Sequence, residues 1–184
     1  LFLHSILKTW IATEACQRLN QDRQSGALEL LLSTPLRVRE IMRGQLLALR
    51  RQFLGPILIV LLTDFLFILS LKSGNSVLTV VFLAGMGMLV ADVYTLSWVG
   101  MWLGLKAKDT NRAAGSAIAR ILILPWIIFY VGAIFQELLP GRSYSTNNYL
   151  PVILWFALGI FIDLIFFARA YNGLMAHLRS IATQ

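Results

Sequence analysis

Long apolar runs separated by short polar breaks dominate the chain. A helix needs about 20 apolar residues to cross a bilayer, and four runs are that long: residues 52–71, 77–105, 121–139 and 149–168. Turn residues mark the breaks between them at 71–76, 106–115 and 139–148. The pattern predicts an all-α, polytopic membrane helix bundle over residues 1–184, with four full transmembrane helices in a single transmembrane domain.

The first segment, residues 1–16, has a different, amphipathic pattern. Polar side chains separate pairs of apolar ones, which predicts a helix; the pairs are Phe2/Leu3, Ile6/Leu7 and Trp10/Ile11. Such a helix either lies on the membrane surface or forms the cytoplasmic end of a transmembrane helix whose outer half is missing. We favour the second interpretation. The chain begins inside an apolar run and without an initiator Met, so we expect it to lack an N-terminal part.

Composition agrees with the membrane class. Hydrophobic residues make up 58% and charged residues 14% of the chain, and the mean hydropathy is +0.72; soluble domains carry about 25% charged residues. The net charge is +7, but the basic residues lie between apolar runs and form no stripe with interleaved aromatics, so we exclude a nucleic-acid partner. The single Cys16 excludes an internal disulfide and a cysteine-based metal site.

The distribution of basic residues predicts the topology. Residues 18–51 hold seven of them, and the next three loops and the C-terminal tail hold one, four, one and two. Because basic residues accumulate on the cytoplasmic side, this alternation places residues 18–51, 106–120 and the C-terminus in the cytoplasm. We expect a multi-pass protein of the plasma membrane, as in the bacterial inner membrane.

The long polar segment 18–51 is predicted to fold. Ser25-Gly26 precedes a short helix-prone run, Ala27–Leu32. Thr34-Pro35 then predicts a second helix that begins at Pro35, with the Thr34 hydroxyl accepting a bond from a backbone N–H. One interpretation is a surface hairpin held to anionic lipids by arginines. The LELLL run is more apolar than a loop needs, which favours a docking element for a partner.

The segment GALELLLSTPLRVREIMRGQ, residues 26–45, resembles the signature of ABC transporter permeases of the type 2 (exporter) class. Their pattern is E-x-G-T-L-E-L-L-L-x-T-P-L-x-x-x-E-I-x-x-G-K. Ala27 stands where Thr is common, and Gln45 where Lys or Glu is common. The matching residues are Gly26, Leu28, Glu29, Leu30, Leu31, Leu32, Thr34, Pro35, Leu36, Glu40, Ile41 and Gly44.

This resemblance implies a coupling segment that rests in a groove of a cytoplasmic ABC ATPase. It implies six membrane helices, of which this chain supplies the last four and the end of the second, and a second permease half in a homodimer or heterodimer. No G-x-x-x-x-G-K-[ST] loop occurs in the sequence. ATP would therefore bind the partner, and this chain would be no enzyme and hold no cofactor. The residues that would couple to the ATPase are Gly26, Leu28, Glu29, Leu30, Thr34, Pro35, Glu40 and Gly44.

Three acids, Asp64, Asp92 and Asp163, lie within the apolar runs. A charge near the bilayer centre costs about 2.5–3.5 kcal/mol on insertion scales, so each acid needs a compensating environment. Two interpretations are open: a translocation path or proton relay, or packing groups that are protonated or bonded to polar side chains of neighbouring helices. Asp92 has Tyr94, Thr95 and Ser97 nearby, which favours a polar interior for its helix.

The remaining motifs concern packing. Gly100 and Gly104 form a GxxxG pattern, which fits either a contact within the bundle, our preference, or a dimer contact. Pro125 is expected to kink the third span. Four tryptophans are typical, in part, of interfacial aromatic belts: Trp98, Trp102, Trp126 and Trp155.

Catalysis and metal binding find no support. His4 and His177 lie far apart in the sequence, and no H-E-x-x-H or comparable catalytic motif occurs. We therefore predict no catalytic and no metal-binding residues. The alternative to an ABC permease is a polytopic membrane protein of another kind, a secondary transporter or an assembly scaffold, that uses the intramembrane acids directly.

Overall fold

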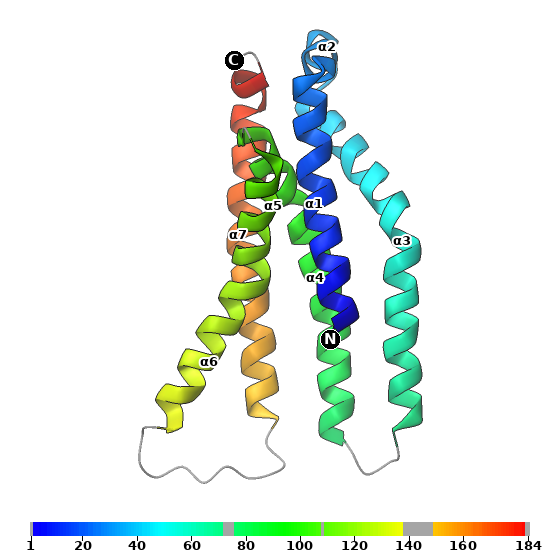
Figure 1. The fold of residues 1–184 in the computed structure, drawn as a ribbon, viewed down its shortest axis with the longest axis vertical. Helices are drawn as coiled ribbons and strands as arrows, with labels where there is room; N and C mark the ends of the chain where they lie inside the picture. The colour runs from blue at the N-terminus through cyan, green and yellow to red at the C-terminus, as the bar shows by residue number, and fades with distance from the viewer. Residues whose placement is uncertain (1, 72–75, 108, 138–148, 183–184) are drawn as a thin grey trace.

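The computed structural model describes residues 2–71, 76–107, 109–137 and 149–182, and every element in them is helical (Figure 1). The elements are α1 (Phe2–Gln24), α2 (Ala27–Ser33), α3 (Val38–Ser70), α4 (Ser76–Lys106), α5 (Thr110–Ile118), the π-helix η1 (Ala119–Ile123), α6 (Leu124–Glu137) and α7 (Leu150–Ala182). Four stretches are long and apolar enough to cross a membrane: Val38–Ser70, Val77–Lys106, Thr110–Gly132 and Leu150–Ala176. The predicted all-α fold with four spans is confirmed.

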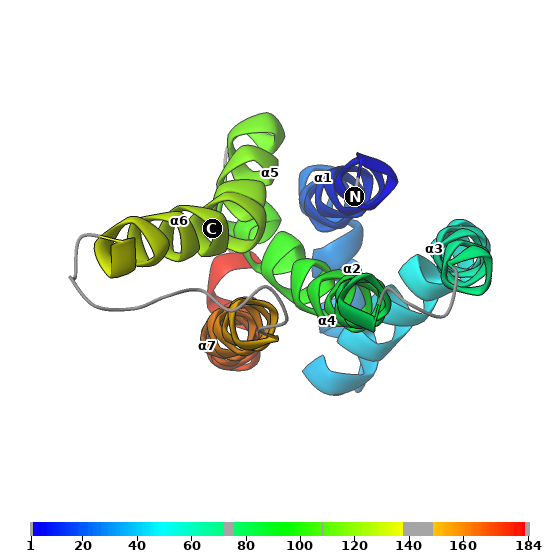
Figure 2. The ribbon, with the colours of Figure 1, turned by 90° about the horizontal axis from the view of Figure 1, so that it is seen from below.

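Helix α4 lies at the centre of the bundle. Figure 2 shows α1 and α7 packed on two sides of α4, with α3 standing apart from the others. Leu89, Leu96 and Leu105 of α4 are fully buried. The short helix α2, the start of α5 and the end of α7 lie at the same end of the molecule (Figure 1). The segments with the most basic residues thus lie at one end.

Small residues bring α1 and α4 into close contact. A Cβ atom added at Gly100 would lie 2.7 Å from Cβ of Ala15, and one added at Gly104 would lie 2.3 Å from the carbonyl oxygen of Cys16. Both glycines are needed because the two backbones approach each other too closely for a side chain. The GxxxG pattern therefore serves packing within the bundle, as preferred from the sequence.

Side chains of α1 also satisfy the C-terminal carbonyls of α4. Asn20 Nδ2 donates to the carbonyl oxygens of Gly104 (3.0 Å) and Ala107 (2.9 Å), and an Arg23 guanidinium nitrogen donates to that of Leu105 (2.8 Å). The last carbonyls of a helix have no partner within the helix, and a cation beside them also meets the negative end of the helix dipole. This end of α4 is thus fixed to α1.

Several helices extend beyond the predicted boundaries. The first segment was predicted to be helical over residues 1–16, but α1 continues through residues 18–24, the first part of the polar segment. The predicted polar break at 106–115 is shorter, because Asp109 accepts a bond from the Asn111 backbone N–H (3.0 Å) and α5 begins at Thr110. Helix α7 continues to Ala182, past the predicted end of its span at 168. The breaks at 72–75 and 139–148 lie outside the described residues.

The third span is interrupted where a kink was predicted. Leu124 donates its backbone N–H to the carbonyl of Ala119, five residues back, and so closes the π-helical turn η1. Pro125, which has no N–H to donate, follows at once. Figure 1 shows α6 leaning away from α7 beyond this point. Pro56 lies inside α3, whose first part slants while the remainder runs upright beside α4.

Candidate functional site

The reversal from α1 into α2 depends on Gly26. This residue has φ +75° and is the only glycine with a positive φ among the described residues. That backbone conformation is unfavourable for residues with a Cβ atom, so a side chain here would be strained. The turn places α2 at the extremity of the bundle (Figure 1).

Helix α2 has one buried and one exposed face. Leu28 is completely buried, and Leu31 and Leu32 pack against the core. Glu29 and Leu30 point outward, and Leu30 is 72% exposed. One face thus attaches the helix to the bundle, while the other offers a carboxylate beside an apolar side chain.

The predicted start of the next helix is wrong. Thr34 follows the end of α2, and its hydroxyl donates to the carbonyl of Leu31 instead of accepting from a following N–H. Helix α3 begins three residues after Pro35, at Val38, where the Glu40 carboxylate accepts a bond from the Arg37 backbone N–H (2.8 Å). Glu40 thus closes a capping box. Thr34 and Pro35 therefore follow the end of α2, and the pair Arg37 and Glu40 forms the cap at which α3 begins.

The predicted coupling residues gather at this end of the molecule. Gly26 to Pro35 form the turn and α2, and Glu40 and Gly44 follow on the first turns of α3. Gly44 is exposed, with no atom within 4 Å of the position a Cβ would take, so close packing does not explain this glycine. Gln45 Nε2 donates to Asp22 Oδ2 (2.6 Å), which joins the start of α3 to the end of α1.

The three intramembrane acids lie away from this tip and face the polar side of α1. His4 Nε2 lies 2.6 Å from Asp64 Oδ2 of α3, and Lys8 forms an ion pair with Asp92 of α4. Asp163 of α7 interacts electrostatically with Asp92 and Lys8. We call these five residues the charge cluster. It joins four helices.

The sequence reading missed the basic members of this cluster. As a packing group, Asp92 was expected to be protonated or bonded to polar side chains of neighbouring helices. Its partner is the basic residue Lys8, and the nearby Ser97 hydroxyl donates to the Val93 carbonyl of its own helix (2.8 Å). The signal was present, because His4 and Lys8 are four residues apart and lie on one face of a helix. The sequence alone did not show whether this polar face of the helix points into the bundle or away from it.

Helix α1 turns this polar face inward and an apolar face outward. Phe2, Leu3 and Ile6 are exposed, whereas His4 is buried. A helix on a membrane surface would keep its polar side in water. The observed arrangement suits a helix surrounded by lipid, in which ionisable groups face the interior of the bundle.

The charge cluster is incompletely bonded. Asp92 is 2% and Asp163 3% exposed. No hydrogen-bond donor among the described residues reaches Oδ1 of Asp92 or either carboxyl oxygen of Asp163, and the two carboxyls lie close enough to share a proton. Buried polar atoms are normally paired, so these oxygens are candidates for binding something else.

A cavity of about 430 Å³ opens beside the cluster, lined by residues of α1, α4, α5, η1, α6 and α7. His4, Lys8 and Asp92 supply its polar part. Trp126 and Trp155 form an aromatic wall, with ring centroids 5.6 Å apart. From the sequence, Trp126 and Trp155 were interpreted only as part of an interfacial aromatic belt.

No cluster of three or more potential metal ligands occurs among the residues that the structure describes. Comparisons with protein-family models, with curated proteins and with solved structures find no match for the chain. Two regions remain for a functional interpretation: the exposed tip formed by α2, and the charge cluster with its cavity.

Proposed function

We propose that this chain is the membrane-spanning permease subunit of an ATP-binding-cassette exporter. The observation that carries the proposal is the geometry of α2. Within the segment that resembles the permease signature, Leu28 fastens the helix to the bundle and Glu29 and Leu30 are presented outward. A short helix held in this way suits a groove in a partner protein and would transmit force to the bundle.

The charge distribution supports the sidedness that such a subunit needs. The tip, the start of α5 and the end of α7 lie at one end of the bundle, and the segments that contain them, residues 18–51, 106–120 and the C-terminal tail, hold most of the basic residues. The positive-inside rule assigns this end to the cytoplasm, where an ATPase binds. A second permease half, in a homodimer or heterodimer, would complete the pathway.

Co-expression with a defined partner tests the proposal. The chain is produced together with the P-loop ATPase that we expect a neighbouring gene to encode, and the ATPase retained on the purified chain is quantified. We expect stoichiometric capture by the unchanged chain and at least a tenfold loss with Leu30→Arg, because the exposed face of α2 would form the contact. Asn111→Arg, exposed on α5 at the same end, adds the same charge and is expected to leave capture unchanged.

Two results would contradict the proposal. One is that the co-expressed ATPase is never retained by the unchanged chain. The other is equal retention by the Leu30→Arg and Asn111→Arg variants, which would remove α2 from the contact.

A second candidate function is favoured by one observation. Ionisable side chains of α1, α3, α4 and α7 meet in the charge cluster, and intramembrane acids of this kind mark ion pathways in secondary transporters. Such a transporter would move its substrate in detergent-free vesicles without any ATPase. Transport that persists without the ATPase and ATP, and that Asp92→Asn abolishes, would favour this alternative.

A further inference from the structure

The cavity beside the charge cluster has the size of a small-molecule site. Its volume of about 430 Å³ falls in the range of roughly 300–1,000 Å³ that is typical of ligand pockets. Apolar side chains of α4, η1 and α6 make up much of its wall, among them Met88, Ile121 and Pro125. A ligand here would be mostly apolar.

Carboxyl groups outnumber basic groups in the charge cluster. Its carboxyls belong to Asp64, Asp92 and Asp163, whereas its basic groups are only Lys8 and His4. The acids outnumber the bases whether or not His4 is protonated. An excess charge in an apolar region is unfavourable unless something neutralises it. An added cation would neutralise this excess, as would a proton shared between the Asp92 and Asp163 carboxyls.

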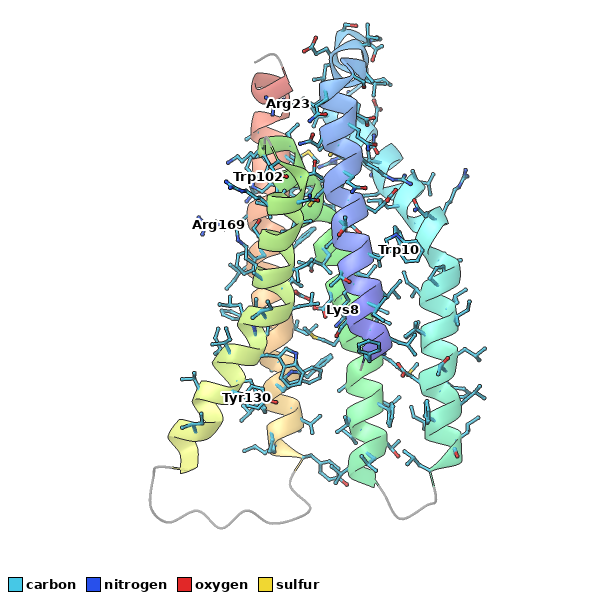
Figure 3. The ribbon with its side chains drawn as sticks, in the orientation of Figure 1. Lys8, Trp10, Arg23, Trp102, Tyr130 and Arg169 are labelled. Atoms are coloured by element: carbon cyan, nitrogen blue, oxygen red, sulfur yellow. The ribbon has the colours of Figure 1, made fainter. Side chains whose placement is uncertain are left out.

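The unpaired oxygens show where such a charge would be held. Asp92 lines the cavity and uses only Oδ2 in its ion pair with Lys8, while Oδ1 has no hydrogen-bond partner among the described residues. The Asp163 carboxyl interacts with that of Asp92, and no hydrogen-bond donor among the described residues reaches either of its oxygens. Figure 3 shows the position of Lys8 on α1, and its ammonium group forms the ion pair with Asp92 of α4.

The aromatic wall suits the same kind of ligand. Trp126 contacts Trp155 and also stacks on Tyr130, with centroids 5.7 Å apart (Figure 3). A cation placed over a tryptophan face is attracted by about 0.5–2 kcal/mol, most strongly where water is excluded. Carboxylate and aromatic faces together form a common recognition site for organic cations.

We propose that this cavity binds a lipophilic organic cation, a molecule that combines one amine or quaternary onium charge with apolar or aromatic groups. Its positive charge lies near Oδ1 of Asp92 and the Asp163 carboxyl, and its apolar part lies against Trp126 and Trp155. This rests on the proposed function in one respect, since it makes such cations the cargo of the permease. Binding itself requires no ATPase.

Two ions of nearly equal shape and opposite charge test the proposal. The purified chain in neutral detergent is equilibrated by dialysis with tetraphenylphosphonium or with tetraphenylborate, and tryptophan quenching is followed in parallel. We expect saturable binding of the phosphonium at least tenfold tighter than that of the borate. Hydrophobicity alone would not discriminate in this direction, so the difference reports the charge of the site.

Variants locate the site. Asp163→Asn, which leaves the Lys8–Asp92 pair intact, is expected to weaken phosphonium binding at least tenfold, and Trp155→Leu several-fold. Asp109→Asn, at the N-terminus of α5, and Trp10→Leu, whose ring packs against Phe53, are the matched controls and are expected to leave binding unchanged. The elution volume of each variant on gel filtration confirms that it is folded.

Equal binding of the two ions, or phosphonium binding unaffected by both Asp163→Asn and Trp155→Leu, would overturn the proposal. The latter result would leave a bound proton as the neutralising charge. The phosphonium-binding experiment contains no ATPase, so its failure can be distinguished from failure of the proposed function. Capture of the ATPase by a chain that does not select the phosphonium would reject only the cargo class.

Discussion

The helices on either side of the exposed tip are attached to the bundle in different ways. Helix α1 lies directly against α4, with backbones in contact at Gly100 and Gly104 and with Asn20 bonded to the end of α4. Helix α3 is separated from α1 and α4 over part of its length by an apolar groove of about 640 Å³. Both helices leave the same tip, yet α1 packs more closely against α4 than α3 does.

Helix α3 meets the rest of the bundle through side chains and not through close backbone contact. Trp10 meets Phe53 edge to face with centroids 5.4 Å apart, His4 meets Asp64, and an Arg39 guanidinium nitrogen donates to the Tyr171 hydroxyl (3.2 Å). Figure 3 shows Trp10 between α1 and α3. A force on α2 would therefore displace α3 more easily than α1, so α3 is the element through which a movement of the tip would reach the membrane.

The largest expected effect comes from enlarging a glycine in the α1–α4 contact. Gly104→Leu should lower the free energy of unfolding by about 3 kcal/mol, because its Cβ would overlap the Cys16 backbone and force the two helices apart. Equilibrium unfolding in mixed micelles of dodecyl sulfate and a neutral detergent measures the change.

The same change on α3 is the control. Gly55 has no atom within 4 Å of the added Cβ position, so Gly55→Leu should change stability by about 1 kcal/mol or less. Similar losses for the two variants would remove the distinction between a closely packed and a loosely held helix.

A smaller effect is expected at the polar end of the α1–α4 contact. Asn20→Leu keeps a similar volume but leaves the Gly104 and Ala107 carbonyls without their partner, which should cost about 2 kcal/mol. Thermal unfolding in detergent measures the loss. Asn111→Leu, exposed on α5, should be neutral; an equally neutral Asn20→Leu would mean that these hydrogen bonds do not hold α1 in place.

The smallest effect is expected where α3 meets α1. Phe53→Leu removes the edge-to-face contact with Trp10 but keeps an apolar side chain, so unfolding should become easier by about 1 kcal/mol. Phe161→Leu, on the exposed surface of α7, is the control for the same substitution at an exposed position. A loss at Phe53 as large as that for Gly104→Leu would show that α3 is held as firmly as α1.

The sequence predicted the parts of this structure that depend on local pattern. Apolar runs identified the four spans, and Gly100 and Gly104 were correctly read as a packing motif. The predicted start of α3 was wrong because two residues, Thr34 and Arg37, lie close together and either can precede a helix. The hydroxyl of Thr34 bonds backward to α2. A single sequence does not rank such solutions, since each satisfies one helix end.

The residues of the charge cluster were visible in the sequence, but their pairing was not. The acids were conspicuous in their apolar runs, and His4 and Lys8 were visible as the polar face of a helix. Pairing them required knowing which helices are neighbours, because Lys8 and Asp92 lie on helices whose contact is decided by small residues elsewhere in the chain. The contacts of Asn20 and Arg23 with the end of α4 escaped prediction for the same reason.

The π-helical turn η1 changes the directions in which side chains point along the span that contains it. A π turn accommodates one residue more than an α turn, and each residue rotates a regular helix by about 100°. The helix faces after residue 123 are therefore turned relative to those of α5. Because of this offset, Ala113 and Ala117 of α5 are buried in the bundle while Trp126 of α6 meets Trp155 on the cavity wall. One additional residue, inserted ahead of a proline, lets a single span present two differently oriented surfaces.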